Sequence, residues 1–473
     1  MTLNQSSREA FLKLGLVFVS SLLLFSTLND SSMWIDEVAT VVMSDPRWGL
    51  GYSDAQMPLV YLMVWLSKLL LGAREFTFRF PVALCAFAFI LVLPKYFAEH
   101  GLNRIAAYLA PLVLLLSPEF LFYAQEARAY VPMVVLLFLW GYCRDKFSGF
   151  KLWLLCTAAL QANTFSILYV VMVLAVDWIG LRRNAKGMSQ WKASALAVLT
   201  HLPSLGYIAW AVKTSRFPVV KSAESNLWAD VLQKALSFEF LEYLKRAWTA
   251  FAPENILGWV VLTVASAVGV ALSRPSTRRY WIGIALALVV HAYILVPTGW
   301  VLYTRYLLML LLLCSVPALS IRLNSFSVGM AWVLFMILIA HASLKPRFEM
   351  LRNEAGQWQG IVSSLFPATA RALTVSSREN WRDLGLFLNR FAKDSDLVGM
   401  QACVKCSPYT LDYYIRRSAN FKLLRIEDNP KTCPDWVVST FREVEMASKC
   451  KKEWIWEFGG LHLYGSSNVH GGG

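Results

Sequence analysis

An acidic pair follows the first long apolar segment of this sequence. Asp36 and Glu37 come directly after Trp34-Ile35, just beyond the apolar residues 11–29. Ionisable side chains at the boundary of a bilayer cost free energy unless a cavity or a partner receives them, so they are functional candidates. We take both carboxylates as candidates for acid–base catalysis, although the same residues would also serve as an ordinary cap on a following helix.

Other polar side chains lie near the ends of later apolar segments. They are Asp54, Gln125, Glu126, Arg128, Tyr130, Arg305 and Tyr306. Acidic groups that face basic groups in a wet cavity suit a reaction in which a base removes a proton from a nucleophile and cations stabilise an anionic leaving group. Plainer roles stay open, because Asp54 can cap a helix and Arg305 with Tyr306 can anchor a span at the headgroups.

The composition indicates a membrane protein. The chain is 57% hydrophobic and only 16% charged, whereas a soluble protein carries roughly a quarter charged residues. Apolar runs near the length of about 20 residues that crosses a bilayer recur along it. We predict an all-α polytopic membrane protein with about eleven transmembrane helices. The predicted spans are 11–29, 80–98, 105–121, 129–143, 150–163, 164–182, 193–212, 256–273, 280–299, 303–321 and 327–344.

Basic residues predict the orientation of these spans. They fall in every second short loop and beside the N-terminus, which by the positive-inside rule places those segments in the cytoplasm and Asp36 outside. This alternation accounts for much of the net charge of +14 without a nucleic-acid partner. Residues 57–72 are apolar but short and carry Lys68. Counting them as a span would move most basic clusters outside, so we predict a helix in the membrane interface there.

Three regions lie outside the predicted spans. Within a transmembrane catalytic domain, residues 1–344, there are two outer loops: 30–79 and the basic loop 213–255, whose charges also suit a lipid surface. Residues 345–473 have ordinary polarity and predict a small extracytoplasmic α/β domain. Its predicted elements are an amphipathic helix at 379–393 and strands at 396–403, 421–426, 435–440, 454–458 and 461–465.

Four cysteines lie in this last region. Cys403, Cys406, Cys433 and Cys450 form an even set that favours one or two disulfides in an oxidising compartment, with three pairings open for four cysteines. The Cys403-x-x-Cys406 spacing also matches half of a zinc site or a redox motif. No second such pair completes a zinc site, so we favour structural disulfides.

The order of these motifs resembles the GT-C membrane glycosyltransferases. The motifs are Trp34-x-Asp36-Glu37, Asp54-x-x-x-Pro58-Leu59-Val60-Tyr61, Arg79-Phe80-Pro81, Gln125-Glu126-Ala127-Arg128-Ala129-Tyr130 and, in the tail, Asn380-Trp381-Arg382, Asp396 and Tyr413-Tyr414. The sequence is most similar to the branch of dolichyl-phosphate-mannose protein mannosyltransferases and lipid A aminoarabinose transferases. The resemblance covers nearly the whole chain.

This resemblance implies transfer of a sugar from a polyprenyl-phosphate donor to a lipid, glycan or protein hydroxyl, on the outer side of the cytoplasmic membrane and with inversion. Asp36 matches the aspartate that the family uses as general base. Glu37 and Glu126 match acidic positions that orient the acceptor or bind metal, so a divalent metal is possible but not assigned. Arg128 and Arg305 are candidates for contacts with the donor phosphate.

The sequence departs from the family at two places. Gln56-Met57-Pro58 stands where a His-Pro-Pro run is frequent, and Thr164-Phe165 stands where a His-aromatic pair is expected. A metal or phosphate role of those histidines is therefore in question here. His291, inside an apolar span, is interpreted as a hydrogen-bonded core residue.

Two other function classes compete with the transferase. A transporter or flippase of lipid-linked substrates would use its charged residues to gate a path, but such folds often carry repeated halves and charges near the midplane. We find no repeat, and the charges gather at the outer ends of spans. A silent relative that acts as a scaffold through residues 345–473 would have lost the acidic pair. The sequence identifies neither the sugar nor the acceptor.

Overall fold

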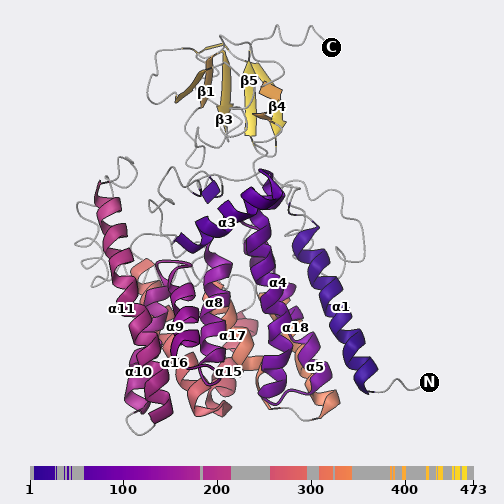
Figure 1. Cartoon of the computed structure of the whole chain (residues 1–473). Coiled ribbons are helices and arrows are strands. Elements are labelled where there is room, and N and C mark those ends of the chain that lie inside the picture. Colours follow the sequence, from indigo (N-terminus) through magenta and orange to yellow (C-terminus); the bar gives the residue numbers. More distant parts are fainter. Residues whose placement is uncertain are drawn as a thin grey trace.

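A body of helices carries a small β-sheet at one of its ends in the computed structural model (Figure 1). The structure describes residues 5–26, 58–181, 185–214, 256–295, 308–322 and 325–343, together with short stretches between residues 28 and 44 and between 384 and 465. The first helix, Gln5–Phe25, begins at the end of the helical body opposite the sheet (Figure 1).

Each of the eleven predicted spans overlaps at least one helix. The helices are α1 (Gln5–Phe25), α3 (Pro58–Leu71), α4 (Glu75–Glu99), α5 (Arg104–Leu109), α6 (Leu112–Leu115), α7 (Pro118–Ala124), α8 (Tyr130–Cys143), α9 (Gly149–Leu160), α10 (Ser166–Leu181), α11 (Ala185–Thr214), α15 (Ile256–Leu272), α16 (Pro275–Leu295), α17 (Leu308–Leu319) and α18 (Phe326–Ser343).

One predicted span is wrong as a single helix. Residues 105–121 form the successive short helices α5, α6 and α7. Pro111 and Pro118 have no backbone N–H to donate. Pro118 also disfavours a helical conformation of the residue before it, and Ser117 is extended there. Ser117 then caps the third piece, because its hydroxyl accepts a bond from the backbone N–H of Phe120 at 3.4 Å.

Helix α3 begins and ends at the same end of the helical body. Glu9 in α1 pairs with Arg104 at 3.0 Å, so the start of α1 lies beside the residues that follow α4. At the other end, Arg79 near the start of α4 donates to the carbonyl oxygen of Leu28, just beyond α1. Helices α1 and α4 therefore traverse the body in opposite directions. Helix α3 runs across the end nearest the sheet (Figure 1), and its depth in a membrane stays a prediction.

Apolar side chains cover the outside of the helices as well as the inside. Phe89, Phe138 and Trp281 are buried in the core, while Phe18 and Ile179 are 68% and 80% exposed. Helices that are apolar all round and expose large hydrophobic side chains are typical of proteins in lipid. Within the described residues, one helix, Glu75–Glu99, is long and apolar enough to cross a bilayer by length and composition, and other apolar helices are 10–17 residues long.

The C-terminal region contains a five-stranded mixed sheet in the order β2-β1-β3-β5-β4. The strands are β1 (Leu397–Met400), β2 (Lys422–Arg425), β3 (Trp436–Ser439), β4 (Glu453–Phe458) and β5 (Leu461–Gly465). Strand β1 pairs in parallel with β2 and β3, whereas β5 pairs antiparallel with β3 and β4. Each strand coincides with one of the runs predicted from the sequence.

Two further contacts join this sheet to its surroundings. Leu384 and Leu388, four residues apart in the predicted 379–393 helix, are both buried, and the Phe387 ring meets the Trp436 ring of β3 edge-on, with 6.1 Å between centroids. Cys433 and Cys450 form a disulfide across 17 residues of sequence. Cys403 and Cys406 lie outside the described residues, so their pairing stays open.

Candidate functional site

A buried ion pair joins the first predicted outer loop to the helical body. The Nε and Nη2 atoms of Arg79 donate to the two carboxylate oxygens of Glu37, each at 2.8 Å. The side chains are 1% and 0% exposed. A forked contact of this kind combines two charge-assisted hydrogen bonds in one plane. It fixes both the position and the orientation of the Glu37 carboxylate.

Two backbone groups complete this ion pair. The backbone N–H of Ala127 donates to Oε1 of Glu37 at 3.0 Å, and Nη1 of Arg79 donates to the carbonyl oxygen of Leu28 at 2.9 Å. The pair therefore connects the end of α1, the residue next to Asp36, the start of α4 and the segment between α7 and α8. Such hydrogen bonds are what makes a buried charge pair tolerable away from water.

The segment Gln125–Tyr130 packs against the same loop. Gln125 donates to the carbonyl oxygen of Leu23 at 2.8 Å. Arg128 donates to the Thr40 hydroxyl at 3.2 Å and to the Tyr130 hydroxyl at 3.4 Å. The Arg128 guanidinium also lies 5.6 Å from the centroid of the Tyr130 ring. Residues far apart in sequence thus converge at one end of the helical body.

Tight local backbone places these side chains. Helix α7 ends before Gln125, and the N–H of Arg128 donates to the carbonyl oxygen of Glu126 at 2.7 Å, so the chain turns within a few residues before α8 begins. The turn directs the Ala127 N–H to Glu37. The neighbouring side chains of Glu126 and Arg128 are 0% and 4% exposed, so the turn is enclosed as a polar layer under the first loop.

The structure brings together five of the predicted site residues. They are Glu37, Gln125, Glu126, Arg128 and Tyr130. The other four lie outside the described residues. They are Asp36, Asp54, Arg305 and Tyr306. Most of the basic 213–255 loop also lies outside them.

Sequence reasoning quoted Arg79 within a motif but gave it no role. The sequence does indicate that Arg79 has a partner, because a charged residue inside an apolar helix needs one. Its partner could not be identified from spacing, since Glu37 is 42 residues away in the chain.

Metal ligands do not gather in the part of the chain that the structure describes. No group of three or more His, Cys, Asp or Glu side chains there is placed to hold an ion.

Comparison with known proteins places this arrangement in a known fold. No protein-family model and no curated protein matches the sequence. A crystal structure of ArnT from Cupriavidus metallidurans bound to undecaprenyl phosphate aligns with 97% of this chain and 99% of its own, with a TM-score of 0.57 and 14% identity. The chain has the fold of ArnT. The apo structure of the same protein gives a TM-score of 0.53 at the same identity, and ArnT is a GT-C lipid A aminoarabinose transferase.

Phe165, which follows the position where the family is expected to carry a histidine, packs against a histidine from another helix. The Phe165 ring lies 4.2 Å, centroid to centroid, from the imidazole of His291 in α16. The Tyr169 hydroxyl lies 2.8 Å from Nδ1 of that imidazole, and His291 is fully buried. The interpretation of His291 as a hydrogen-bonded core residue is thus confirmed.

Proposed function

We propose that this protein is a membrane glycosyltransferase that moves a sugar from a polyprenyl-phosphate donor to a hydroxyl group of a lipid, glycan or protein. Two observations support the proposal together. The chain shares its fold with ArnT, which was crystallised with undecaprenyl phosphate. Five of the nine polar side chains predicted for the reaction meet in one buried layer.

The observation that carries the proposal is the anchored carboxylate of Glu37. Arg79 and the Ala127 N–H engage both of its oxygens, so this group is occupied in holding the loop. The resemblance to the GT-C glycosyltransferases assigns the proton transfer to Asp36, the sequence neighbour of Glu37. We assign Glu37 and Arg79 as positioning residues and Asp36 as the general base.

The reaction follows from these roles. The Asp36 carboxylate accepts the proton of the acceptor hydroxyl as the hydroxyl oxygen forms a bond to the anomeric carbon of the donor sugar. The bond between that carbon and the phosphate oxygen breaks, and the polyprenyl phosphate leaves with the electron pair. Direct displacement inverts the anomeric centre. Cations close to the departing oxygen lower the barrier because negative charge develops there.

Arg128 is the described cation best suited to that departing phosphate. Its hydrogen bonds to Thr40 and Tyr130 measure 3.2 and 3.4 Å, at the long end for N–H donors. The resemblance to the GT-C glycosyltransferases also selects Arg128 for the donor phosphate. Arg305 would supply a second cation.

The membrane setting rests on surface chemistry. Large apolar side chains are exposed around the helices, and the Cys433–Cys450 disulfide suits an oxidising compartment. The sheet that carries this disulfide lies at the end of the body crossed by α3, near the start of α4 (Figure 1). We therefore place that end, with the site, on the outer face of the cytoplasmic membrane.

Asp36→Asn tests the proposal. The purified protein in lipid nanodiscs is incubated with radiolabelled polyprenyl-phosphate sugars, including aminoarabinose and mannose donors, and a membrane extract as acceptor. We expect transfer to fall by a factor of roughly 10²–10⁴ with an unchanged melting temperature. Glu9→Gln, a carboxylate at the far end of α1, is the matched control and should transfer normally.

Two outcomes would contradict the assignment. Near-normal turnover of Asp36→Asn would show that Asp36 is not the general base. Movement of a fluorescent polyprenyl-phosphate sugar across proteoliposome membranes, with no transfer from any donor, would favour the flippase class instead.

A further inference from the structure

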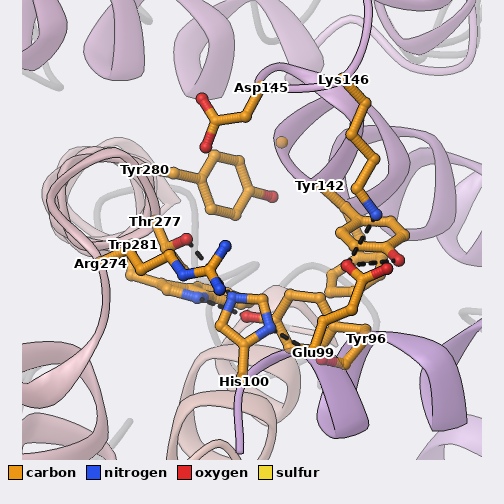
Figure 2. A pocket seen from close by; sticks show the side chains of 12 residues that line it. Tyr96, Glu99, His100, Tyr142, Asp145, Lys146, Arg274, Thr277, Tyr280 and Trp281 are labelled. Carbon is orange, nitrogen blue, oxygen red and sulfur yellow. Dashed lines mark hydrogen bonds and ion pairs between the residues drawn. The ribbon is translucent and has the colours of Figure 1, made fainter.

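A polar cavity lies at the end of the helical body away from the Glu37–Arg79 pair. It has a volume of about 60 Å³ and opens between the last turn of α4, the end of α8 and the start of α16. Figure 2 shows charged side chains and aromatic rings that project into it from these different walls. It lies far from the site proposed for sugar transfer, and the proposed reaction does not use it.

The charges around the cavity have both signs. Lys146 pairs with Glu99 at 2.7 Å, and its Nζ lies 3.6 Å from the centroid of the Tyr142 ring. Asp145 accepts a hydrogen bond from the Ser276 hydroxyl. Arg274 contributes a guanidinium from the opposite wall, at the start of α16 (Figure 2).

His100 and Thr277 supply neutral polar groups between these charges. Nδ1 of His100 lies 2.7 Å from the Tyr96 carbonyl oxygen, which can only accept, and Nε2 lies 3.4 Å from the Thr277 hydroxyl. Burial is the main cause that lowers the pKa of His100, so the ring contributes hydrogen bonds and no charge near neutral pH. The long contact leaves the Thr277 hydroxyl able to turn toward another acceptor.

We propose that this cavity binds the phosphoethanolamine headgroup of a phospholipid. The phosphate lies against Arg274 and the Thr277 hydroxyl, and the ammonium group lies toward the Asp145 carboxylate. A purely anionic ligand would meet the Asp145 and Glu99 carboxylates, and a purely cationic one would meet Arg274. A zwitterion places its negative group beside Arg274 and its positive group beside Asp145.

The size of the cavity agrees with this ligand. One water molecule needs roughly 10–15 Å³ of cavity volume. The volume of about 60 Å³ here therefore accommodates several non-hydrogen atoms. That is the size of a phosphate group. The rest of the headgroup extends through the opening toward Asp145, which is exposed at the rim.

Neighbouring side chains favour a lipid over a soluble phosphate ester. Phe147 and Phe150, which follow the cavity residue Lys146 in the chain, are 38% and 71% exposed. Exposed phenylalanines beside basic and tyrosine side chains are typical of a surface at headgroup depth. The acyl chains on the glycerol of the bound lipid would pack on these rings.

Native mass spectrometry of the delipidated full-length protein tests the proposal. The ligands are phosphatidylethanolamine, phosphatidylglycerol and soluble O-phosphoethanolamine. We expect the ethanolamine lipid to bind best and Arg274→Gln to weaken it about tenfold, as for one charge-assisted hydrogen bond. Asp145→Asn should weaken the ethanolamine lipid without weakening phosphatidylglycerol. Arg278→Gln, an exposed arginine one turn further along α16 that does not line the cavity, should leave binding unchanged.

Three results would overturn the proposal. Equal losses for Arg274→Gln and Arg278→Gln would indicate general surface charge and no built site. Equal binding of both lipids with no effect of Asp145→Asn would refute the zwitterion. Soluble O-phosphoethanolamine that binds as tightly as the lipid would refute the lipid source. Circular dichroism melting of each variant shows that it is folded.

Discussion

The two ends of the helical body carry ion pairs that differ in exposure. At the end crossed by α3, the Arg79 and Glu37 side chains are 1% and 0% exposed and bond in a planar fork. At the other end, the side chains of Arg104 and Glu9 are 67% and 27% exposed, and those of Lys146 and Glu99 are 36% and 35% exposed. The residue types are the same, but their exposure to water differs.

This difference separates a positioning device from a surface anchor. Removing one partner of a buried pair leaves an uncompensated charge, whereas an exposed pair is screened and each partner is solvated on its own. A chain keeps a buried pair where a fixed geometry is needed. The Asp177–Arg144 pair at the other end is also buried, with side chains 6% and 8% exposed, so burial alone does not mark the site. What distinguishes the Glu37–Arg79 pair is that it anchors the segment next to Asp36.

The largest expected effect is that of Arg79→Met. Leaving the Glu37 carboxylate buried without its guanidinium should destabilise the protein by about 3–5 kcal/mol. Sugar transfer should also fall, because the loop next to Asp36 loses its anchor. Unfolding in mixed micelles with increasing SDS measures the first effect, and turnover per folded protein measures the second.

The double variant Glu37→Gln with Arg79→Met separates these two effects. It removes both charges, so it should recover part of the stability while transfer stays low. Recovery of transfer together with stability would show that the pair matters only for folding.

An intermediate effect is expected for Asp177→Asn. Asp177 in α10 pairs with Arg144 at 2.7 Å and with Arg279 at 3.2 Å. This cluster lies next to the cavity between α4, α8 and α16, yet the Asp177 side chain is only 6% exposed. Arg279 is 24% exposed, so water relieves part of the loss, and we expect about 2 kcal/mol of destabilisation.

The same SDS titration measures the effect of Asp177→Asn. Turnover per folded protein should stay normal, since the cluster lies away from the proposed site. A loss of turnover at full folding would contradict the division between the two ends.

The smallest effect is expected for Arg104→Gln. Its contact with Glu9 is largely exposed, and pairs of this kind contribute roughly 0–1 kcal/mol. The unfolding midpoint should therefore move little, and it should move less still at high salt. A shift as large as that of Arg79→Met would show that burial does not determine how much an ion pair contributes to stability here.

Local patterns predicted much of the fold. The five strands of the C-terminal sheet lie in the runs where β-branched and aromatic residues were read as strands. The apolar runs each contain helix, because hydrophobic length and period are local properties. The prediction of one helix over residues 105–121 is wrong. The segment is apolar, but it contains Pro111 and Pro118 and forms three short helices.

The site was predictable in its residues but not in its pairing. Glu37 and Arg128 were selected because charges at the ends of apolar segments need partners. Arg79, the residue that binds Glu37, stood in a quoted motif without a role. Nothing local shows that residues 37, 79 and 127 meet, since that meeting depends on how α1, α4 and the turn before α8 pack.

The sequence by itself determined which segments are apolar, where the basic loops recur and where strands and charged candidates lie, because each of these depends on neighbouring residues. Only the tertiary structure decided that Arg79 holds Glu37 and that Arg274 and Asp145 face a common cavity. Those facts depend on contacts between segments that are tens to more than a hundred residues apart. Such contacts form when the whole chain packs, so a local sequence pattern does not predict them.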